Sequence, residues 1–285
     1  MHVRVNGVRL YFDVEGLGLV PDGPLMREKP TLLLLHGGPG FDHSMFKPQL
    51  SQLCDIAQVI YLDHRGNGRS EEGPREASTL AQWGDDVRGF CEALGIARPI
   101  VWGTSFGGMV AMAYATRHPD HPGKLILVST EAAGGRHAEQ KVAMFTRLGG
   151  PEVGALARRR MIENEGGEAL LKDWIRLAFP HYTRVPRDSM MRRAIHKPDI
   201  LHWFARPGGE GRTFDLFAAL PRIKCPTLVL GGEEDPMTPI ECQVDIAAAL
   251  PAHLVRLVRF PNAGHGVIGD APEPAFAAIR DFITQ

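Results

Sequence analysis

The sequence predicts an α/β protein with a mostly parallel, doubly wound sheet that is interrupted by a helical insertion. Short, unbroken apolar segments, which suit strands buried on both faces, alternate with helical patterns through the first half of the chain. Alternation of this kind is typical of parallel strands joined by right-handed crossovers. The alternation stops near Ala132 and resumes after Thr213, and a length of 285 residues accommodates one domain with such an insertion.

The predicted strands and helices follow one another in a simple order. The chain opens on a β-hairpin with Asn6-Gly7 as its turn, and a loop rich in Gly and Pro follows from residue 16 to 30. Helical patterns are clearest over residues 80–94 and 108–118, the second ending just before Pro119. Six apolar segments are predicted to be buried strands: residues 31–35, 57–62, 99–102, 124–129, 227–230 and 254–260.

The insertion is predicted to be a helical cap of residues 132–213 on a core domain of residues 1–131 and 214–285. Helical patterns cover residues 151–162 and 168–179. The cap has 15 basic and 9 acidic residues, a net charge of +6, and the remainder of the chain has a net charge of −7. We interpret this division as charge complementarity between cap and core rather than selection of anionic substrates, because most of the arginines are expected to face solvent.

The bulk composition excludes several classes of protein. An apolar fraction of 44%, a charged fraction of 23% and a net charge of −1 give no indication of nucleic acid or a membrane surface as partner. No segment approaches the roughly 20 apolar residues that span a bilayer, and no signal peptide is seen, so we expect a cytoplasmic protein. The four cysteines form no CxxC pair or Cys/His cluster, so we expect buried free thiols, no metal site and no cofactor.

The candidate nucleophile is Ser105, in Gly103-Thr104-Ser105-Phe106-Gly107. This segment fits G-x-S-x-G between a predicted strand and a predicted helix, which is the context that the motif requires. The glycines permit a sharp turn that holds the serine in a strained conformation at the edge of the sheet. The N-terminus of the following helix favours the negative charge that develops there.

A serine hydroxyl needs a base, and the base needs a carboxylate that orients it. His265 follows the last predicted strand, at the edge where open α/β sheets bind ligands. Asp235 follows the strand before it, and the chain order Ser, Asp, His is that of hydrolases with this motif. The alternatives to Asp235 are Glu233 and Glu234 in the same loop, which we interpret as solvated, and Glu131 after another strand.

Two backbone N–H groups are predicted to hold the oxyanion. The residue after the nucleophile, Phe106, supplies one of them. The second is expected from Gly38 in His36-Gly37-Gly38-Pro39-Gly40, because glycines let the backbone approach a substrate closely. His36 is expected to brace this loop rather than to act in catalysis.

These motifs together resemble the α/β-hydrolase superfamily in order and spacing, and the resemblance covers the predicted sheet. It implies that the helical insertion is the cap of that fold, which covers a pocket for a small substrate. Within the superfamily, HGGPG and DHRGNGRS resemble the proline iminopeptidase group. The segments that carry the likeness are HGGPG (36–40), DHRGNGRS (63–70), GTSFGG (103–108), GGEED (231–235) and NAGHG (262–266).

The predicted function is cleavage of a small carboxylic ester or lactone through an acyl-enzyme, without a cofactor. The alternative is a proline iminopeptidase-like aminopeptidase or amidase. It ranks second because that group has Gly-Gly-Ser-Trp-Gly at the elbow, and some members place a glutamate where this chain has Pro236. The cap acids Glu163, Glu165 and Glu168 are interpreted as surface residues. A third possibility, of another class, is a non-catalytic receptor for a small ligand on the same fold.

Overall fold

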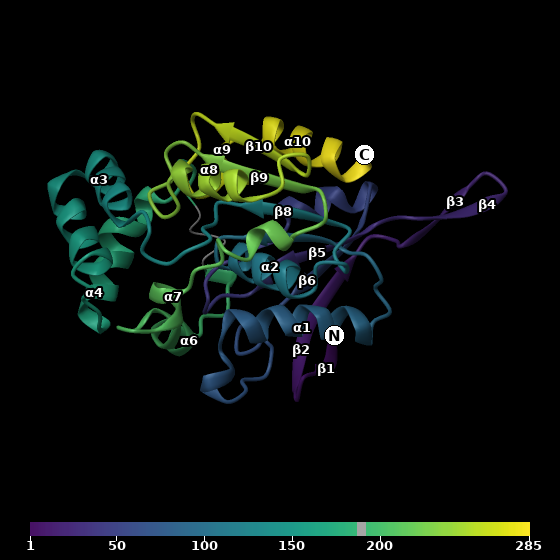
Figure 1. The fold of residues 1–285 in the computed structure, drawn as a ribbon, viewed down its shortest axis with the longest axis horizontal. Coiled ribbons are helices and arrows are strands. Elements are labelled where there is room, and N and C mark those ends of the chain that lie inside the picture. Colours follow the sequence, from purple (N-terminus) through teal and green to yellow (C-terminus); the bar gives the residue numbers. More distant parts are fainter. Residues whose placement is uncertain (187–191) are drawn as a thin grey trace.

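An eight-stranded sheet forms the centre of the computed structural model, which describes residues 1–186 and 192–285 (Figure 1). The strand order is β1-β2-β6-β5-β7-β8-β9-β10. The pairs β1–β2 and β2–β6 are antiparallel and all the others are parallel, which confirms the predicted mostly parallel, doubly wound sheet. The strands are β1 (His2–Val5), β2 (Val8–Glu15), β5 (Thr31–Leu35), β6 (Gln58–Leu62), β7 (Ile100–Thr104), β8 (Lys124–Val128), β9 (Thr227–Gly232) and β10 (Val255–Phe260).

The direction of winding reverses at β5, which lies between β6 on one side and β7 on the other. The loops that leave β5 and β7 therefore diverge at the carboxyl edge of the sheet. Such a switch point is where open α/β sheets bind their ligands. The HGGPG loop and the G-x-S-x-G turn are these two loops, so the fold brings them to the same edge.

Both faces of the central strands are covered, which explains why they are apolar without alternation. The prediction of a buried strand over residues 254–260 is wrong in its burial, because β10 is an edge strand in which Arg256 and Arg259 are exposed. In β5, Leu33 and Leu35 contribute to one core cluster, and Leu32 and Leu34 to the other. The first cluster lies under α1 (Leu80–Ala93), α2 (Phe106–Arg117) and α8 (Ile240–Ala249). The second lies under α10 (Pro272–Thr284), α9 (Val267–Asp270) and the 3₁₀ segments His43–Phe46 and Gln49–Asp55.

The segment between β8 and β9 is helical where the structure describes it, and it forms a lobe beside one end of the sheet (Figure 1). Its first helix begins at Ala138 rather than at the predicted residue 151, and it continues through a kink at Gly150 (φ 83°) before Pro151. This lobe has an apolar cluster of its own, which includes Phe145 and Trp174. Its helices are α3 (Ala138–Met161), α4 (Glu168–Asp173), a π-helical turn (Trp174–Ala178), a 3₁₀ turn (Phe179–His181), α6 (Pro198–Ala205) and α7 (Glu210–Thr213).

The prediction of a loop over residues 16–30 is wrong. The segment contains a hairpin of β3 (Leu19–Asp22) and β4 (Leu25–Glu28) that turns at Gly23 (φ 59°) and projects from the body (Figure 1). Its side chains are mostly exposed, Leu25 most of all at 72%. An exposed hairpin has no apolar alternation, and alternation is the pattern by which sequence analysis recognises a strand.

The four cysteines are free, and three of them, Cys91, Cys225 and Cys242, are buried. Burial raises the pKa of Cys91 to about 12 and that of Cys225 to about 11, so these thiols are unreactive. Cys54 is half-buried, and burial raises its pKa as well. Among the described residues, no helix has the length and apolar character needed to cross a membrane.

Candidate active site

Ser105 lies at the bend between β7 and α2, with φ 53° and ψ −119°. Few residues other than glycine adopt this strained conformation. The flanking glycines allow it. A Cβ at Gly103 would overlap with the Gly107 carbonyl, and a Cβ at Gly107 with the Leu35 carbonyl. The Thr130 hydroxyl donates to the Ser105 carbonyl at 2.7 Å and holds the bend from the side of β8.

Asp235 and His265 form a hydrogen-bonded pair at the ends of β9 and β10. His265 Nδ1 lies 2.8 Å from Asp235 Oδ2 and 3.1 Å from Oδ1, and the Asp235 side chain is fully buried. Oδ1 also accepts the N–H groups of Met237 and Thr238, at 2.8 and 2.9 Å, and Oδ2 accepts the Thr238 hydroxyl at 2.7 Å. The carboxylate is therefore fixed, and it directs the second nitrogen of the imidazole, Nε2, away from itself.

A residue of the helical segment, Tyr182, contacts the loop that carries His265. The His265 N–H donates to the Tyr182 carbonyl at 2.6 Å, and the two rings meet edge to face with centroids 5.7 Å apart. A Cβ at Gly264 would overlap with the same carbonyl, which explains a glycine before the histidine. Neither Tyr182 nor Thr238 follows from a sequence motif, although an aspartate that accepts N–H groups two and three residues ahead is a common turn pattern.

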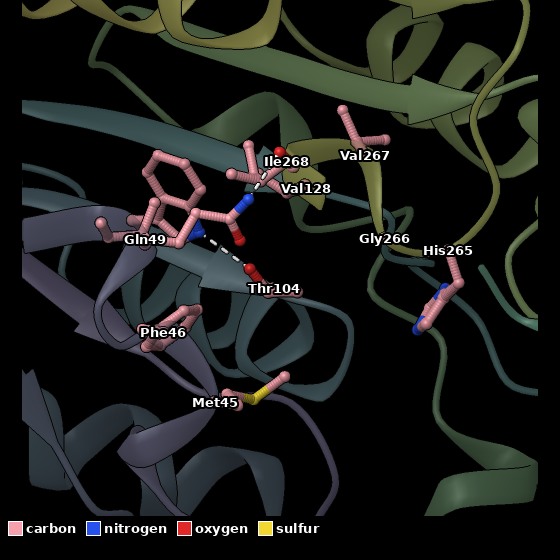
Figure 2. Close-up of a pocket in the computed structure, with 11 residues that line it drawn as sticks. Met45, Phe46, Gln49, Thr104, Val128, His265, Gly266, Val267 and Ile268 are labelled. Atoms are coloured by element: carbon pink, nitrogen blue, oxygen red, sulfur yellow. Dashed lines mark hydrogen bonds between the residues drawn. The ribbon is translucent and has the colours of Figure 1, made fainter. Parts of the chain in front are cut away.

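A small cavity of about 30 Å³ separates part of the serine loop from the histidine loop (Figure 2). Thr104, directly before Ser105, and His265 both line it, together with apolar side chains such as Met45, Phe46 and Val267. In the described part of the chain, Ser105 Oγ makes no hydrogen bond to His265. The structure thus brings Asp235 and His265 together and places Ser105 at the same sheet edge, but the hydrogen bond between Ser105 and His265 is not formed. Such bonds are often long without substrate.

The two N–H groups predicted to hold an oxyanion both have no acceptor among the described residues. The Phe106 N–H is at the first turn of α2, where N–H groups lack helical partners. Gly38 adopts φ 129°. The N–H groups of the two nearby glycines already have acceptors: the Gly37 N–H donates to Met45 Sδ at 3.2 Å and the Gly40 N–H to Asn67 Oδ1 at 2.6 Å.

His36 supports the glycine-rich loop from below, which is the role expected for it. Its Nδ1 lies 2.8 Å from the Gly37 carbonyl, and its Nε2 accepts the His64 N–H at 3.2 Å, so the ring is neutral with its proton on Nδ1. Burial lowers the pKa of His36, and it lowers the pKa of His64 well below its usual value. Both rings therefore stay neutral inside the fold.

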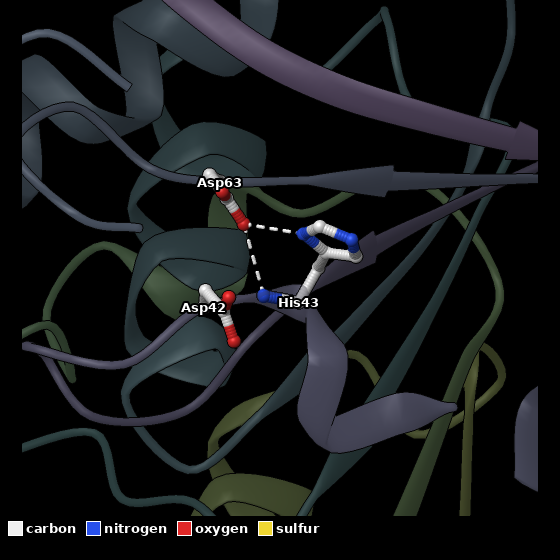
Figure 3. Close-up of side chains that lie close together, drawn as sticks. All are labelled: Asp42, His43 and Asp63. Carbon is white, nitrogen blue, oxygen red and sulfur yellow. Dashed lines mark hydrogen bonds and ion pairs between the residues drawn. The ribbon is translucent and has the colours of Figure 1, made fainter. Parts of the chain in front are cut away.

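Asp42, His43 and Asp63 cluster beneath the same loop with atoms close enough to hold a metal ion (Figure 3). Their oxygens already accept protein donors. Asp63 Oδ1 accepts His43 N at 2.9 Å and pairs with His43 Nδ1 at 2.7 Å, and Asp63 Oδ2 accepts Arg69 N at 2.9 Å. Asp42 accepts from Ser44 and Arg69. These hydrogen bonds fit a structural role for the cluster, which connects the HGGPG segment to the DHRGNGRS segment.

The rival acids have other partners. Glu233 pairs with Arg259 at 2.7 Å, and Glu234 pairs with Arg184. Glu131 forms a buried ion pair with Lys141 of α3, with 2.7 Å between Oε2 and Nζ. None of these carboxylates is hydrogen-bonded to His265 among the described residues, which leaves Asp235 as the acid beside it.

Comparison with known proteins agrees with this architecture. The model of the alpha/beta hydrolase family matches residues 32–279. The chain belongs to the alpha/beta hydrolase family. It is 28% identical over 282 residues to a putative carbamate hydrolase RutD of Caulobacter sp. (strain K31), with 96% of each chain covered. It is 29% identical to a proline iminopeptidase of Lactobacillus helveticus (strain DPC 4571), with 90% of this chain and 91% of the relative covered.

Among solved structures, a thermophilic esterase from Thermogutta terrifontis is 28% identical, with a TM-score of 0.68 and coverage of 100% of this chain and 98% of the other. The relatives thus act on esters, carbamates or peptides by name, and all of them are hydrolases. An alpha/beta hydrolase fold and a hydrolytic role are supported, and the resemblance to the proline iminopeptidase group is confirmed.

Proposed function

We propose that this alpha/beta hydrolase is a serine hydrolase that cleaves a small carboxylic ester or lactone through an acyl-enzyme on Ser105. One observation carries the proposal: a serine in a strained strand-to-helix bend lies at the same sheet edge as a buried carboxylate that orients an imidazole. In the proposed arrangement His265 is the base for the Ser105 hydroxyl, and Asp235 is the acid that orients this base.

The proposed reaction uses these groups in two matching halves. His265 Nε2 takes the Ser105 proton as Ser105 Oγ attacks the acyl carbon, and Asp235 stabilises the imidazolium. The Gly38 and Phe106 N–H groups bind the oxyanion. His265 then gives its proton to the leaving oxygen, and a water molecule, deprotonated by the same imidazole, releases the acid.

The surroundings support a small substrate. The cavity beside His265 is small, and most of its lining residues are apolar, with Val128 and Ile268 side by side in the view (Figure 2). A space of about 30 Å³ holds a water molecule or a methyl-sized group, so only a short acyl or alcohol end fits there without rearrangement.

The decisive experiment is covalent labelling with a fluorophosphonate probe, followed by mapping of the labelled peptide. We expect one label, on Ser105, and none in a folded Ser105→Ala variant. A folded wild-type protein that resists the probe would contradict the proposal. As a second variant, Asp235→Asn keeps the shape of the site but favours the wrong tautomer of His265, and we expect kcat to fall roughly 10⁴-fold.

The aminopeptidase alternative remains on the strength of the proline iminopeptidase relative. It needs an acid for the substrate amine. The three cap acids singled out from the sequence have other surroundings: Glu163 is exposed, Glu165 pairs with Arg159, and Glu168 pairs with Lys172 at the surface. A panel of aryl esters, lactones, aryl carbamates and prolyl arylamides separates the classes. Cleavage of the arylamides alone would reverse our order, and tight retention of ligand with negligible turnover would favour a receptor.

A further inference from the structure

Three consecutive arginines at the end of α3 have different surroundings. Arg158 pairs with Glu139 at 3.1 Å and Arg159 pairs with Glu165 at 2.5 Å, and both pairs lie at the surface. Arg160 instead places its guanidinium over the Trp174 ring, 4.5 Å from the ring centroid. Successive residues of a helix point about 100° apart, so the third arginine turns towards the interior of the helical lobe while the first two do not.

Arg160 is half-buried and has no acidic partner. Within residues 1–186 and 192–285, no carboxylate lies within 4 Å of its guanidinium, and no oxygen accepts its N–H groups. Burial lowers the pKa of Arg160, which reflects the cost of holding this charge away from water. A guanidinium has five donors, and no oxygen of the described residues accepts them here, so they are available to a ligand.

A second guanidinium stands behind the first. Arg212 donates to the Arg160 carbonyl at 3.0 Å, the Asn164 side-chain oxygen at 2.7 Å and the Ala205 carbonyl at 2.7 Å. These acceptors are neutral, and the described residues place no carboxylate within 4 Å of Arg212 either. Burial and the Arg160 charge both lower the pKa of Arg212. The two cations therefore add their fields where the chain supplies no counter-charge.

A continuous set of contacts connects Arg160 to the candidate base. Trp174, under the guanidinium, donates its indole N–H to the Tyr182 hydroxyl at 2.7 Å. Tyr182 in turn holds His265 through its carbonyl and its ring. The ring centroids are 6.4 Å apart for Trp174–Tyr182 and 5.7 Å for Tyr182–His265. Arg160 and His265 therefore lie at the two ends of one set of contacting side chains.

We propose that Arg160, backed by Arg212, binds a carboxylate at the far end of the substrate, so that the preferred substrates are esters or lactones that carry an acid group. This inference rests on the proposed function of the same site. A planar guanidinium with free N–H groups suits a carboxylate, which it can bind through two parallel hydrogen bonds. Arg158 and Arg159 pair with acids of the same helical segment, whereas Arg160 has no such partner among the described residues.

The test is a matched pair of substrates assayed with matched variants. Mono-(4-nitrophenyl) adipate carries a carboxylate, and 4-nitrophenyl adipamate replaces that carboxylate with a neutral amide of the same shape. We expect the wild type to prefer the adipate through a lower KM. Arg160→Gln should reduce kcat/KM for the adipate about tenfold, mostly by raising KM, and leave the adipamate within about twofold. Arg158→Gln, which removes the same charge from the same turn, should change neither.

Three results would overturn the inference: equal losses on both esters in Arg160→Gln, no loss on either, or the same loss in Arg158→Gln. The adipamate reports on the proposed function separately, because its hydrolysis needs Ser105 but no anion site. If the wild type cleaves neither ester, the proposed function fails. Calorimetric titration of adipate into wild type and Arg160→Gln then decides the anion site, and equal binding by both would exclude it.

Discussion

The Thr238 hydroxyl and the His265 imidazole share one oxygen of Asp235. Thr238 Oγ1 lies 2.7 Å from Asp235 Oδ2, and His265 Nδ1 lies 2.8 Å from the same atom. With the Thr238 N–H on the other oxygen, one threonine holds both ends of the carboxylate. The orientation of the imidazole therefore depends on a residue three positions after the acid, which makes no hydrogen bond to Ser105 among the described residues.

Replacing Thr238 with valine should lower kcat about tenfold with little change in KM. The variant keeps its shape and its backbone N–H but loses the hydroxyl that steadies Oδ2, so the carboxylate orients His265 less well. Steady-state kinetics on an aryl ester measure this. Thr238→Ser keeps the hydroxyl and should retain most of the activity. If both variants are equally impaired, the methyl group rather than the hydrogen bond matters.

Replacing Gly107 with alanine should destabilise the fold by about 3 kcal/mol or prevent soluble expression. The new Cβ would overlap with the Leu35 carbonyl, and backbone atoms of a central strand cannot move aside. Urea unfolding measures the loss. Gly166→Ala, whose Cβ would meet nothing within 4 Å, serves as the control and should stay within about 0.5 kcal/mol of the wild type. Comparable stability of the two variants would show that the elbow tolerates a side chain.

Much of the site could be predicted because each of its parts directly follows a strand. Ser105, Asp235 and His265 come after β7, β9 and β10, and parallel strands end at one edge, so their neighbourhood follows from the topology alone. The acidic rivals could not be excluded in this way. That Glu131 pairs with Lys141 depends on where α3 packs, which no local pattern reveals.

The insertion was less predictable for a physical reason. Gly150 and Pro151 kink α3, so the helical period before the kink says nothing about the direction of residues after it. The period of residues 151–162 places Arg160 on the side of Val153 and Leu156, but its contact with Trp174 needs coordinates. Tyr182 holds His265 through a backbone carbonyl, and the glycine at 264 that makes room for this carbonyl does not reveal which residue approaches it.

Breaking the buried ion pair between Glu131 and Lys141 should cost about 3–5 kcal/mol. Their side chains are 11% and 8% exposed, and in a Lys141→Met variant Glu131 keeps a buried charge without a partner. The double variant Glu131→Leu/Lys141→Met leaves no charge unpaired and should recover most of the loss. Chemical denaturation of the three proteins measures this, and additive losses in the double variant would contradict a paired role.

The Glu131–Lys141 ion pair should also make the stability of the fold depend on pH in the alkaline range. Burial alone would lower the pKa of Lys141, but Glu131 and other nearby acidic groups raise it above its usual value of 10.5. A raised folded pKa means that the contribution is complete below pH 10.5 and is lost as the pH rises through the folded value. The wild type should therefore lose stability above pH 10.5 more steeply than the double variant, as equilibrium unfolding across that range can measure.

Replacing His64 with phenylalanine should make stability less dependent on pH on the acidic side. Burial lowers the folded pKa values of His36 and His64 below 6.5, so the unfolded chain binds more protons than the native one as the pH falls from 6.5 towards the folded values. The stability that the two neutral rings contribute is complete above pH 6.5 and is lost below it. His64 Nε2 is buried and has no hydrogen-bond partner within residues 1–186 and 192–285, so phenylalanine also removes an unsatisfied polar atom. Urea unfolding between pH 7.5 and 5 should show equal or higher stability for His64→Phe at pH 7.5. The dependence of its stability on pH should be shallower than that of the wild type by up to about 1.4 kcal/mol per pH unit.

His253→Gln, at an exposed position, is the control. Parallel slopes for the wild type and His64→Phe would mean that His64 gains its proton equally well in the folded protein.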